Sequence, residues 1–544
     1  MPRVTFLLRA VALLSGVLCL SQAQNRNAKP PDKAAGAHFE TSDRCFACHN
    51  GISTPSGEDI SIGLSWRPTM MANSARDPYW LAGVRRETID HPAARAAIED
   101  ECSICHMPMA RHESKLAGHE GEIFSHLPFD RRKISDRLAA DGVSCPVCHQ
   151  IEDKKLGTRE SFVGGFVIDP VSHNGERRAF GPFEIDAGRT TVMRSSSGFR
   201  PAEAKHIRQS ELCATCHTLY TTALGAQGQP IGELPEQVPY QEWLHSEYRT
   251  TTSCQACHMP EVSGQAPITS VLGQSRSGMA RHVFVGGNFF MPRLLNRYRD
   301  DLGVTALPQE LESAAVRTVA HLESEAARIA IRRVEVEAGR LNAEVAVENL
   351  GGHKLPTAYP SRRVWLRFTV RDPNRAVVFE SGALNADGSI RGNDNDADPN
   401  RYEPHFTEIR DAGQVQVYES IMVDEAGRLT TGLLTALRYA KDNRLLPKGF
   451  DKRTAPADVA VHGGAADDPD FTGGGDSVRY SVALGAAQGP FEIEAELWYQ
   501  PIAYRWASNL RTYGAQEPRR FAGYFDSMAS ASAVLLVRAS AQIR

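Results

Sequence analysis

The spacing of hydrophobic residues predicts two long helices. In residues 77–101 and again in residues 309–331, apolar side chains recur at intervals of three and four residues, which places them on one helix face. Pro308 stands just before the second segment, where proline favours the start of a helix. We therefore expect the first helix to lead into the cysteine pair at 102–105 and the second to end near residue 331.

Beyond Ala330 the pattern changes from a helical period to alternation, which is typical of strands with one buried face. Asp372-Pro-Asn supplies a turn between two of the alternating segments. The predicted strands are 341–347, 364–370, 376–379, 477–484, 491–497 and 533–537. Short strands separated by turns predict an antiparallel β-sandwich over residues 333–544.

The first 23 residues have the features of a secretory signal peptide. A basic start is followed by an apolar run that ends at Ser21-Gln-Ala23, so cleavage after Ala23 is expected. An uncleaved membrane anchor is the alternative, but Arg9 leaves too few apolar residues before the end of the run to cross a bilayer. Residues 24–40 form a polar leader, and no later segment is apolar enough for a membrane span.

Length and composition restrict the remaining possibilities. A chain of 544 residues exceeds one ordinary core and predicts two or three domains. Hydrophobic residues make up 42% and charged residues 23%, as in soluble globular proteins. The formal net charge of −4 argues against nucleic acid as a partner.

The cysteines form a regular pattern. Of the 11 cysteines, Cys19 lies in the signal peptide and the other ten form five C-x-x-C pairs, each followed directly by His. The five motifs are Cys45-Cys48-His49, Cys102-Cys105-His106, Cys145-Cys148-His149, Cys213-Cys216-His217 and Cys254-Cys257-His258, numbered here 1 to 5 in chain order. C-x-x-C-H is the attachment motif of c-type haem, in which both thiols bind the porphyrin and the His binds its iron.

Other uses of paired cysteines fit less well. Structural zinc takes C-x-x-C pairs two at a time, whereas five is an odd number, and zinc requires no His after each pair. Redox C-x-x-C motifs occur singly, and disulfide frameworks belong to short secreted chains. We therefore expect five covalently bound haem c groups, which would fill a mainly helical and loop-rich region at residues 41–305. Residues 306–332 would link it to the β-sandwich, giving an α+β multidomain fold.

An internal repeat accompanies the motifs. The order CxxCH, Trp-x-x-[Ser/Thr], CxxCH-Met-Pro and Met-Ala-Arg-His occurs twice, at motifs 1 and 2 and again at motifs 4 and 5. Residues 40–290 resemble multihaem cytochromes of the cytochrome c-554 type, which carry W-x-x-S-x-H with its His as an axial iron ligand. Met71 and Tyr248 occupy that His position here. Met is a good sixth ligand, whereas Tyr is a poor one for an electron-transfer haem.

Candidate sixth iron ligands come from the repeat and from the resemblance. His112 and His282 each end a Met-Ala-Arg-His segment. The run Gly352-His353-Lys-Leu-Pro-Thr357 resembles a segment of related multihaem cytochromes whose His reaches an iron. Met71 follows from the alignment above, with Met70 as the neighbouring alternative. His206 is the weakest candidate, in competition with His91, His126, His173 and His245.

Two acidic loops, 394–398 and 467–470, offer carboxylates that could bind Ca²⁺. The first lacks the Gly and the Glu of an EF-hand loop, so solvated loops without calcium are the better expectation.

These features predict a periplasmic or secreted pentahaem cytochrome that transfers electrons between redox partner proteins. The alternative is a multihaem oxidoreductase in which one haem, near Tyr248, is open to a small nitrogen or sulfur compound. In a third interpretation the β-sandwich is a docking module. The sequence favours electron transfer over catalysis, and it indicates neither the electron donor and acceptor nor the oligomeric state.

Overall fold

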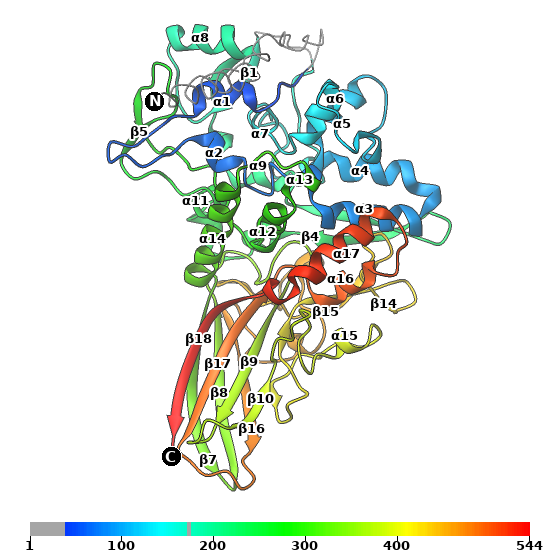
Figure 1. Cartoon of the computed structure of the whole chain (residues 1–544), viewed down its shortest axis with the longest axis vertical. Coiled ribbons are helices and arrows are strands. Elements are labelled where there is room, and N and C mark those ends of the chain that lie inside the picture. The colour runs from blue at the N-terminus through cyan, green and yellow to red at the C-terminus, as the bar shows by residue number, and fades with distance from the viewer. Residues whose placement is uncertain (1–37, 171–175) are drawn as a thin grey trace, which may run out of the picture. The chain divides into compact units, whose positions relative to one another are not determined.

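The computed structural model describes residues 38–170 and 176–544. The predicted signal peptide and nearly all of the polar leader lie outside the described residues. Within the described ranges, no helix is long and apolar enough to cross a membrane. Helices and several mainly antiparallel sheets make this an α+β chain (Figure 1).

Residues 38–306 contain short helices joined by loops. The helices are α1 (Asp43–His49), α2 (Ile62–Trp66), α3 (Pro78–Asp90), α4 (Arg95–His106), α5 (Pro108–Leu116), α6 (Ile134–Ala140), α7 (Cys145–Cys148), α8 (Ala187–Ser197), α9 (Ser210–Ala214), α10 (Pro239–Leu244), α11 (Cys254–His258), α12 (Phe290–Arg297) and α13 (Arg299–Leu302). Three two-stranded pairs accompany them: β1 (Arg177–Gly181) with β2 (Phe199–Glu203), β3 (Leu219–Leu224) with β4 (Pro230–Gln237), and β5 (Gln265–Pro267) with β6 (Ser275–Ser277).

The helix predicted for residues 77–101 is divided into α3 and α4. The side chain of Asp77 caps α3 by accepting the backbone N–H groups of Tyr79 and Trp80, at 2.8 and 3.3 Å. The chain turns at His91-Pro92, because proline cannot donate the hydrogen bond that would continue α3.

The second predicted helix ends six residues early. Helix α14 (Pro308–Glu325) is followed by strand β7 (Ala327–Glu337), so the expected helical end at residue 331 is wrong. The β-branched Ile329 and Ile331 point to the same strand face, and β7 pairs along its length with β8 (Arg340–Asn349). Pairing with β8 outweighs the helical spacing of these last residues.

The C-terminal region is built around two larger sheets. One has the order β10 (Val377–Ser381), β9 (Arg363–Arg371), β17 (Phe491–Gln500), β18 (Val534–Ile543), with β12 (Val417–Tyr418) also on β9. The other has the order β11 (Glu408–Ile409), β16 (Gly475–Ala483), β8, β7. A third sheet joins β14 (Leu429–Thr430), β13 (Ser420–Val423) and β15 (Arg438–Asp442). All six predicted strands are present, and the last one extends to Ile543.

The two larger sheets share one hydrophobic core. Phe368 of β9 stacks on Tyr480 of β16, with ring centroids 3.9 Å apart, so the inner faces of the sheets touch. Figure 1 shows the long strands β7, β8, β9, β17 and β18 running side by side. Burial of alternate side chains on both sheets supplies most of the stabilisation of this region.

Helices α15 (Asp394–Ala397), α16 (Tyr504–Leu510) and α17 (Gln516–Met528) interrupt the strands. Helix α17 packs on α3, where Phe521 meets Tyr79 with ring centroids 4.9 Å apart and Arg85 pairs with Glu517 at 2.8 Å. The C-terminal region therefore packs directly against the region that carries the cysteine motifs.

Candidate cofactor site

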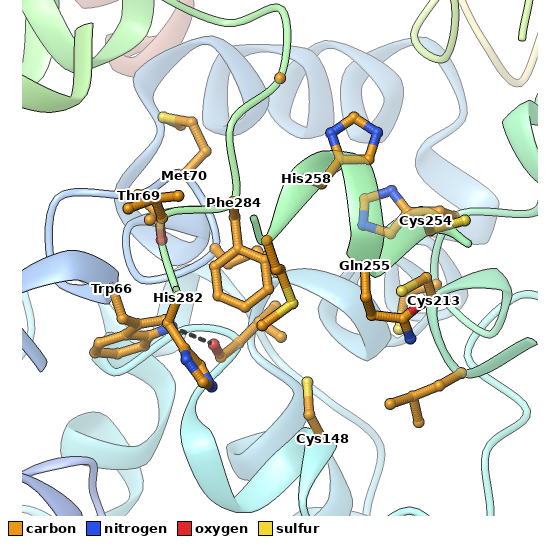
Figure 2. Close-up of a pocket in the computed structure, with 18 of the residues that line it drawn as sticks. Trp66, Thr69, Met70, Cys148, Cys213, Cys254, Gln255, His258, His282 and Phe284 are labelled. Carbon is orange, nitrogen blue, oxygen red and sulfur yellow. Dashed lines mark hydrogen bonds between the residues drawn. The ribbon is translucent and has the colours of Figure 1, made fainter. Parts of the chain in front are cut away.

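All five CxxCH motifs line one cavity. Its volume is about 1580 Å³, and its wall includes both cysteines and the histidine of every motif. A pocket for one small ligand occupies roughly 300–1,000 Å³. Figure 2 shows part of this wall, to which motif 3 contributes Cys148, motif 4 contributes Cys213, and motif 5 contributes Cys254 and His258. The cavity is therefore suited to several large groups attached at successive motifs.

Each motif forms a single helical turn. Motifs 1, 2, 3 and 5 lie on α1, α4, α7 and α11, and motif 4 begins on α9. At motif 4 the turn continues, because His217 N–H donates to the carbonyl of Cys213 at 2.9 Å. A turn places residues i and i+3 on one face, so both thiols of a pair point to the same side.

Thiols of different motifs are direct neighbours. The thiol of Cys45 interacts with that of Cys145, and the thiol of Cys213 with that of Cys254. The thiols of Cys105 and Cys216 interact in the same way. Cys148 also interacts electrostatically with Cys216. Motif 4 therefore lies next to motifs 2, 3 and 5, and motif 1 lies next to motif 3, so the five motifs form one connected cluster that branches at motif 4.

The motif histidines are held in one orientation. At four motifs the imidazole Nδ1 is hydrogen-bonded to a backbone carbonyl: His49 to Ile268 at 2.7 Å, His106 to Ser74 at 3.1 Å, His149 to Phe180 at 2.6 Å and His258 to Val285 at 2.5 Å. A proton held at Nδ1 leaves the lone pair at Nε2, the tautomer that binds a metal. Burial lowers the pKa of His106 and of His217 to about 4, so these rings are neutral at pH 7.

Two predicted ligands face motif histidines. The ring centroids of His149 and His282 are 6.3 Å apart, and those of His258 and His353 are 6.2 Å apart. Two imidazole nitrogens on opposite sides of one metal, each at the ~2 Å typical of nitrogen ligands, place their ring centroids about 6 Å apart. The Nδ1 atoms of His282 and His353 also contact backbone carbonyls, those of Ala280 and Lys354, both at 3.1 Å. The geometry fits an iron held between each pair.

A further histidine lies beside motif 5. His321 of α14 lines the cavity, and its ring centroid is 6.4 Å from that of His258 at an interplanar angle of 61°. Sequence reasoning missed this residue. The signal was present, because helical spacing puts His321 on the same face as Ala314 and Thr318, and all three line the cavity.

The other predicted ligands are placed differently. Met71 lines the cavity, as do Met70 and Met193, the last of which was not predicted. The structure does not bring His112 or His206 to a motif histidine. His112 lies on α5 with its Nε2 buried and without a hydrogen-bond partner among the described residues, next to Phe39. His206 is buried and its Nε2 contacts the carbonyl of Ile151 at 2.8 Å.

The hydroxyl of Tyr248 is engaged by a hydrogen bond within the protein. Its hydroxyl donates to the carbonyl of Leu350 at 2.9 Å. Gly352 passes over the same side chain so closely that a Cβ there would lie 3.4 Å from the Cβ of Tyr248. Tyr248 therefore supports the loop that presents His353, and this contact does not favour the open site predicted at Tyr248.

Contacts of motif 5 recur at motif 3. The indole N–H of Trp66 donates to Val143 O at 3.2 Å, and that of Trp243 to Thr252 O at 2.9 Å; each carbonyl lies two residues before the first cysteine of motif 3 or 5. Phe180 N–H donates to His149 O and Val285 N–H to His258 O, at 2.7 and 3.1 Å, while the same two residues accept from the histidine rings. In the sequence repeat, motif 5 corresponds to motif 2, whereas in these hydrogen bonds it corresponds to motif 3.

The acidic loops use their carboxylates internally. Asp396 pairs with Arg363 at 2.8 Å, and Asp394 pairs with Arg401. In the second loop, Asp468 accepts from His405 Nε2 at 3.0 Å. Cations and donors of the chain thus already pair with Asp394, Asp396 and Asp468.

His405, Asp468 and Asp476 lie close enough to hold a metal ion. Amide groups of Gln416 and Asn443 approach His405 Nδ1 at 2.9 and 3.1 Å, and each amide is oriented by a backbone N–H that its oxygen accepts. Nδ1 must therefore accept, which leaves the proton on Nε2. A protonated Nε2 donates to Asp468 and cannot bind a metal, so this cluster is a hydrogen-bond network.

Comparisons with known proteins give one informative result. No family model matches the chain, and no curated protein matches it either. The fold is similar to that of a penta-heme cytochrome c552 from Thermochromatium tepidum, with a TM-score of 0.52 and 15% sequence identity. The match covers 93% of this chain and 100% of the other, so the likeness includes the C-terminal sheets as well as the motif region.

Proposed function

We propose that the chain is an exported c-type cytochrome that binds five haems covalently and transfers electrons through them. The observation that carries this proposal is the single cavity lined by all ten cysteines and five histidines of the CxxCH motifs. The penta-heme cytochrome of similar fold supports the same conclusion.

The chain's own residues would have distinct tasks. The cysteine pairs would hold each haem permanently, and the motif histidines would bind iron through Nε2 because Nδ1 is engaged by backbone carbonyls. His282 and His353 would complete the coordination at motifs 3 and 5. When bound, haem supplies a reversible one-electron change at its iron.

The arrangement of the motifs supports a relay. Neighbouring thiols connect motif 1 to 3 and motif 4 to 2, 3 and 5, so no motif is isolated from the others. An iron with two protein ligands has no room for a substrate, which favours electron transfer at motifs 3 and 5. Electrons would pass to and from redox partner proteins in the periplasm or outside the cell.

Export of the chain and its relationship to the cytochrome c-554 type are inferred from the sequence. The signal-like start supports export and cleavage after Ala23, and the repeated W-x-x-[ST] segments support kinship with the cytochrome c-554 type. We interpret the two packed sheets at the C-terminus as a β-sandwich that closes the cavity through the His353 loop.

Intact mass spectrometry of the exported protein tests the haem count. We expect the denatured chain to retain the mass of five haems, and the Cys213→Ala/Cys216→Ala variant to retain four. The Thr215→Val variant, changed between the same two cysteines, is the matched control and should retain five. A chain of bare polypeptide mass, or pigment released by denaturation, would contradict the proposal.

A further inference from the structure

The loop that presents His353 is held by buried polar side chains from two directions. This loop, residues 350–362, joins β8 to β9. It places the ring of His353 opposite that of His258 of motif 5, with centroids 6.2 Å apart and an interplanar angle of 7°. We propose that Glu242 and Asn349 are positioning residues that keep His353 on the iron of motif 5. This inference rests on the proposed function, because it assumes that motif 5 carries a haem.

Glu242 reaches the loop from the motif region. It lies on α10 and is fully buried. Its Oε2 accepts the backbone N–H of Lys354 at 3.1 Å and also the hydroxyl of Thr357. Lys354 directly follows His353, so one carboxylate oxygen holds the loop next to the proposed ligand and again three residues further on.

Asn349 reaches the same loop from the end of β8, where its side chain is buried. Its Nδ2 donates to His353 O at 2.8 Å, and its Oδ1 accepts Gly351 N–H at 2.8 Å. The peptide group that follows His353 is therefore bonded at both of its polar atoms. Asn349 binds its carbonyl, and Glu242 binds its N–H. These two bonds restrict the backbone from which the imidazole of His353 extends.

An arginine and a second carboxylate keep Glu242 in place. Arg444 Nη1 forms an ion pair with Glu242 Oε1 at 3.0 Å, without the alignment of a hydrogen bond. The other donors of Arg444 hold Asp442 at 2.7 and 2.8 Å, and Lys354 Nζ donates to Asp442 at 2.7 Å. Two buried carboxylates thus face two buried cations, and loss of one partner from such a cluster is strongly destabilising. Glu242 is therefore a fixed support for the loop and not a mobile side chain.

Helix α10 also holds the other side of motif 5. Trp243, the residue after Glu242, donates its indole N–H to Thr252 O, two residues before Cys254. Adjacent residues of one helix therefore contact the segment that enters the motif and the loop that carries the opposing histidine. Groups that bond to the surroundings of a metal ligand fix its orientation, and their loss typically weakens metal binding about 10–100-fold. We therefore expect His353 to depend on Glu242 for its position.

Optical and electron paramagnetic resonance spectra of the full-length haem-loaded protein test this role. In Glu242→Ala, Lys354 N–H and the Thr357 hydroxyl lose their acceptor. About one fifth of the haem should then become high-spin, as in His353→Ala. Glu242→Gln keeps an acceptor oxygen for both donors and should retain the low-spin spectrum.

The matched control removes a buried glutamate elsewhere in the C-terminal region. Glu496 of β17 is paired with Arg367 and Arg538, at 3.1 and 3.2 Å. Within the described residues, its side chain bonds to no part of loop 350–362. We expect Glu496→Ala to lose stability and to keep the wild-type spectra.

The outcomes separate two kinds of failure. Wild-type spectra in Glu242→Ala or in His353→Ala would overturn the positioning role, as would an equal high-spin signal in Glu242→Gln or in Glu496→Ala. Intact mass is measured on the same samples, and fewer than five haems in the wild-type protein would instead overturn the proposed function. If Glu242→Ala does not fold, Asn349→Asp replaces it, because aspartate keeps the acceptor for Gly351 N–H and removes the donor to His353 O. The same high-spin signal is expected, and wild-type spectra in this variant would overturn the positioning role.

Discussion

Motifs 3 and 5 are enclosed in the same way, and motif 2 is not. At motifs 3 and 5 one backbone residue contacts both the carbonyl and the ring of the motif histidine, and a second histidine faces that ring at 6.2–6.3 Å. At motif 2 the histidine stacks on Trp80, and the neighbouring wall carries buried carboxyl groups. The difference shows that motifs of identical spacing can lie in different surroundings.

Surroundings of these two kinds have different physical consequences. Two imidazoles across one iron favour a low-spin centre that changes little during electron transfer. Buried carboxyl groups near Cys102 instead link the charge of that site to protonation. The contrast between these surroundings can be broken at either motif.

Removal of His282 should have the largest effect. In His282→Ala the iron of motif 3 would lose the imidazole opposite His149, so about one fifth of the haem should become high-spin in optical and electron paramagnetic resonance spectra. His206→Ala is the control, because its Nε2 is bonded to Ile151 O; the spectra should remain unchanged while the protein loses about 1–3 kcal/mol of stability. Unchanged spectra in His282→Ala would refute the pairing with His149.

At motif 5 the same experiment must distinguish two histidines. Both rings are partly buried, and burial lowers the pKa of both histidines. They differ in their contacts, because His353 Nδ1 contacts Lys354 O, whereas no hydrogen bond orients the ring of His321 among the described residues. We therefore expect His353→Ala to produce the high-spin signal of one haem and His321→Ala to leave all five spectra unchanged. The reverse result would assign His321 to this iron and make motif 5 unlike motif 3.

The CxxCH motifs could be recognised in the sequence because their spacing is local information, and their role in haem attachment stays a prediction. Periodicity likewise located the six strands, since side-chain alternation is local information. The sequence could not predict that the ring of His282 lies opposite that of His149, because this position depends on a loop that closes across the cavity and not on nearby sequence.

The two Met-Ala-Arg-His segments illustrate the limit. Identical letters predicted identical roles, yet His282 faces a motif histidine and His112 does not. In the second copy, the 18 residues 261–278 separate Met-Ala-Arg-His from CxxCH-Met-Pro, so the two copies differ in spacing. The end of α14 at Glu325 was missed for a similar reason, because pairing with β8 is a contact that helical spacing does not reveal.

The acidic wall near motif 2 should make stability depend on pH. Burial raises the pKa of Glu236 from 4.5 to about 7, so the folded protein binds this proton more tightly than the unfolded chain. The contribution of protonated Glu236 to the free energy of unfolding is complete below pH 4.5. It is lost as the pH rises through 7, by roughly 3 kcal/mol. The free energy of unfolding of Glu236→Gln, measured by chemical denaturation between pH 5 and 9, should lack this pH-dependent decrease. Glu233→Gln, an exposed position on the same strand, should retain it, and a wild-type profile in Glu236→Gln would refute the assignment.

The smallest effect tests whether motifs 3 and 5 are truly equivalent. Trp66 and Trp243 each donate to the carbonyl two residues before the first cysteine of their motif, so Trp66→Phe and Trp243→Phe should each cost about 1 kcal/mol in the free energy of unfolding. Phenylalanine keeps the aromatic packing and removes only the donor, so the spectra of all five haems should be unchanged. Trp80→Phe at motif 2 is the contrasting variant. Trp80 stacks on His106 and its indole N–H has no hydrogen bond within the described ranges, so this substitution removes no donated hydrogen bond. If only one of Trp66→Phe and Trp243→Phe loses stability, motifs 3 and 5 are not equivalent. Motif 2 would then no longer be the one motif that differs from a matching pair.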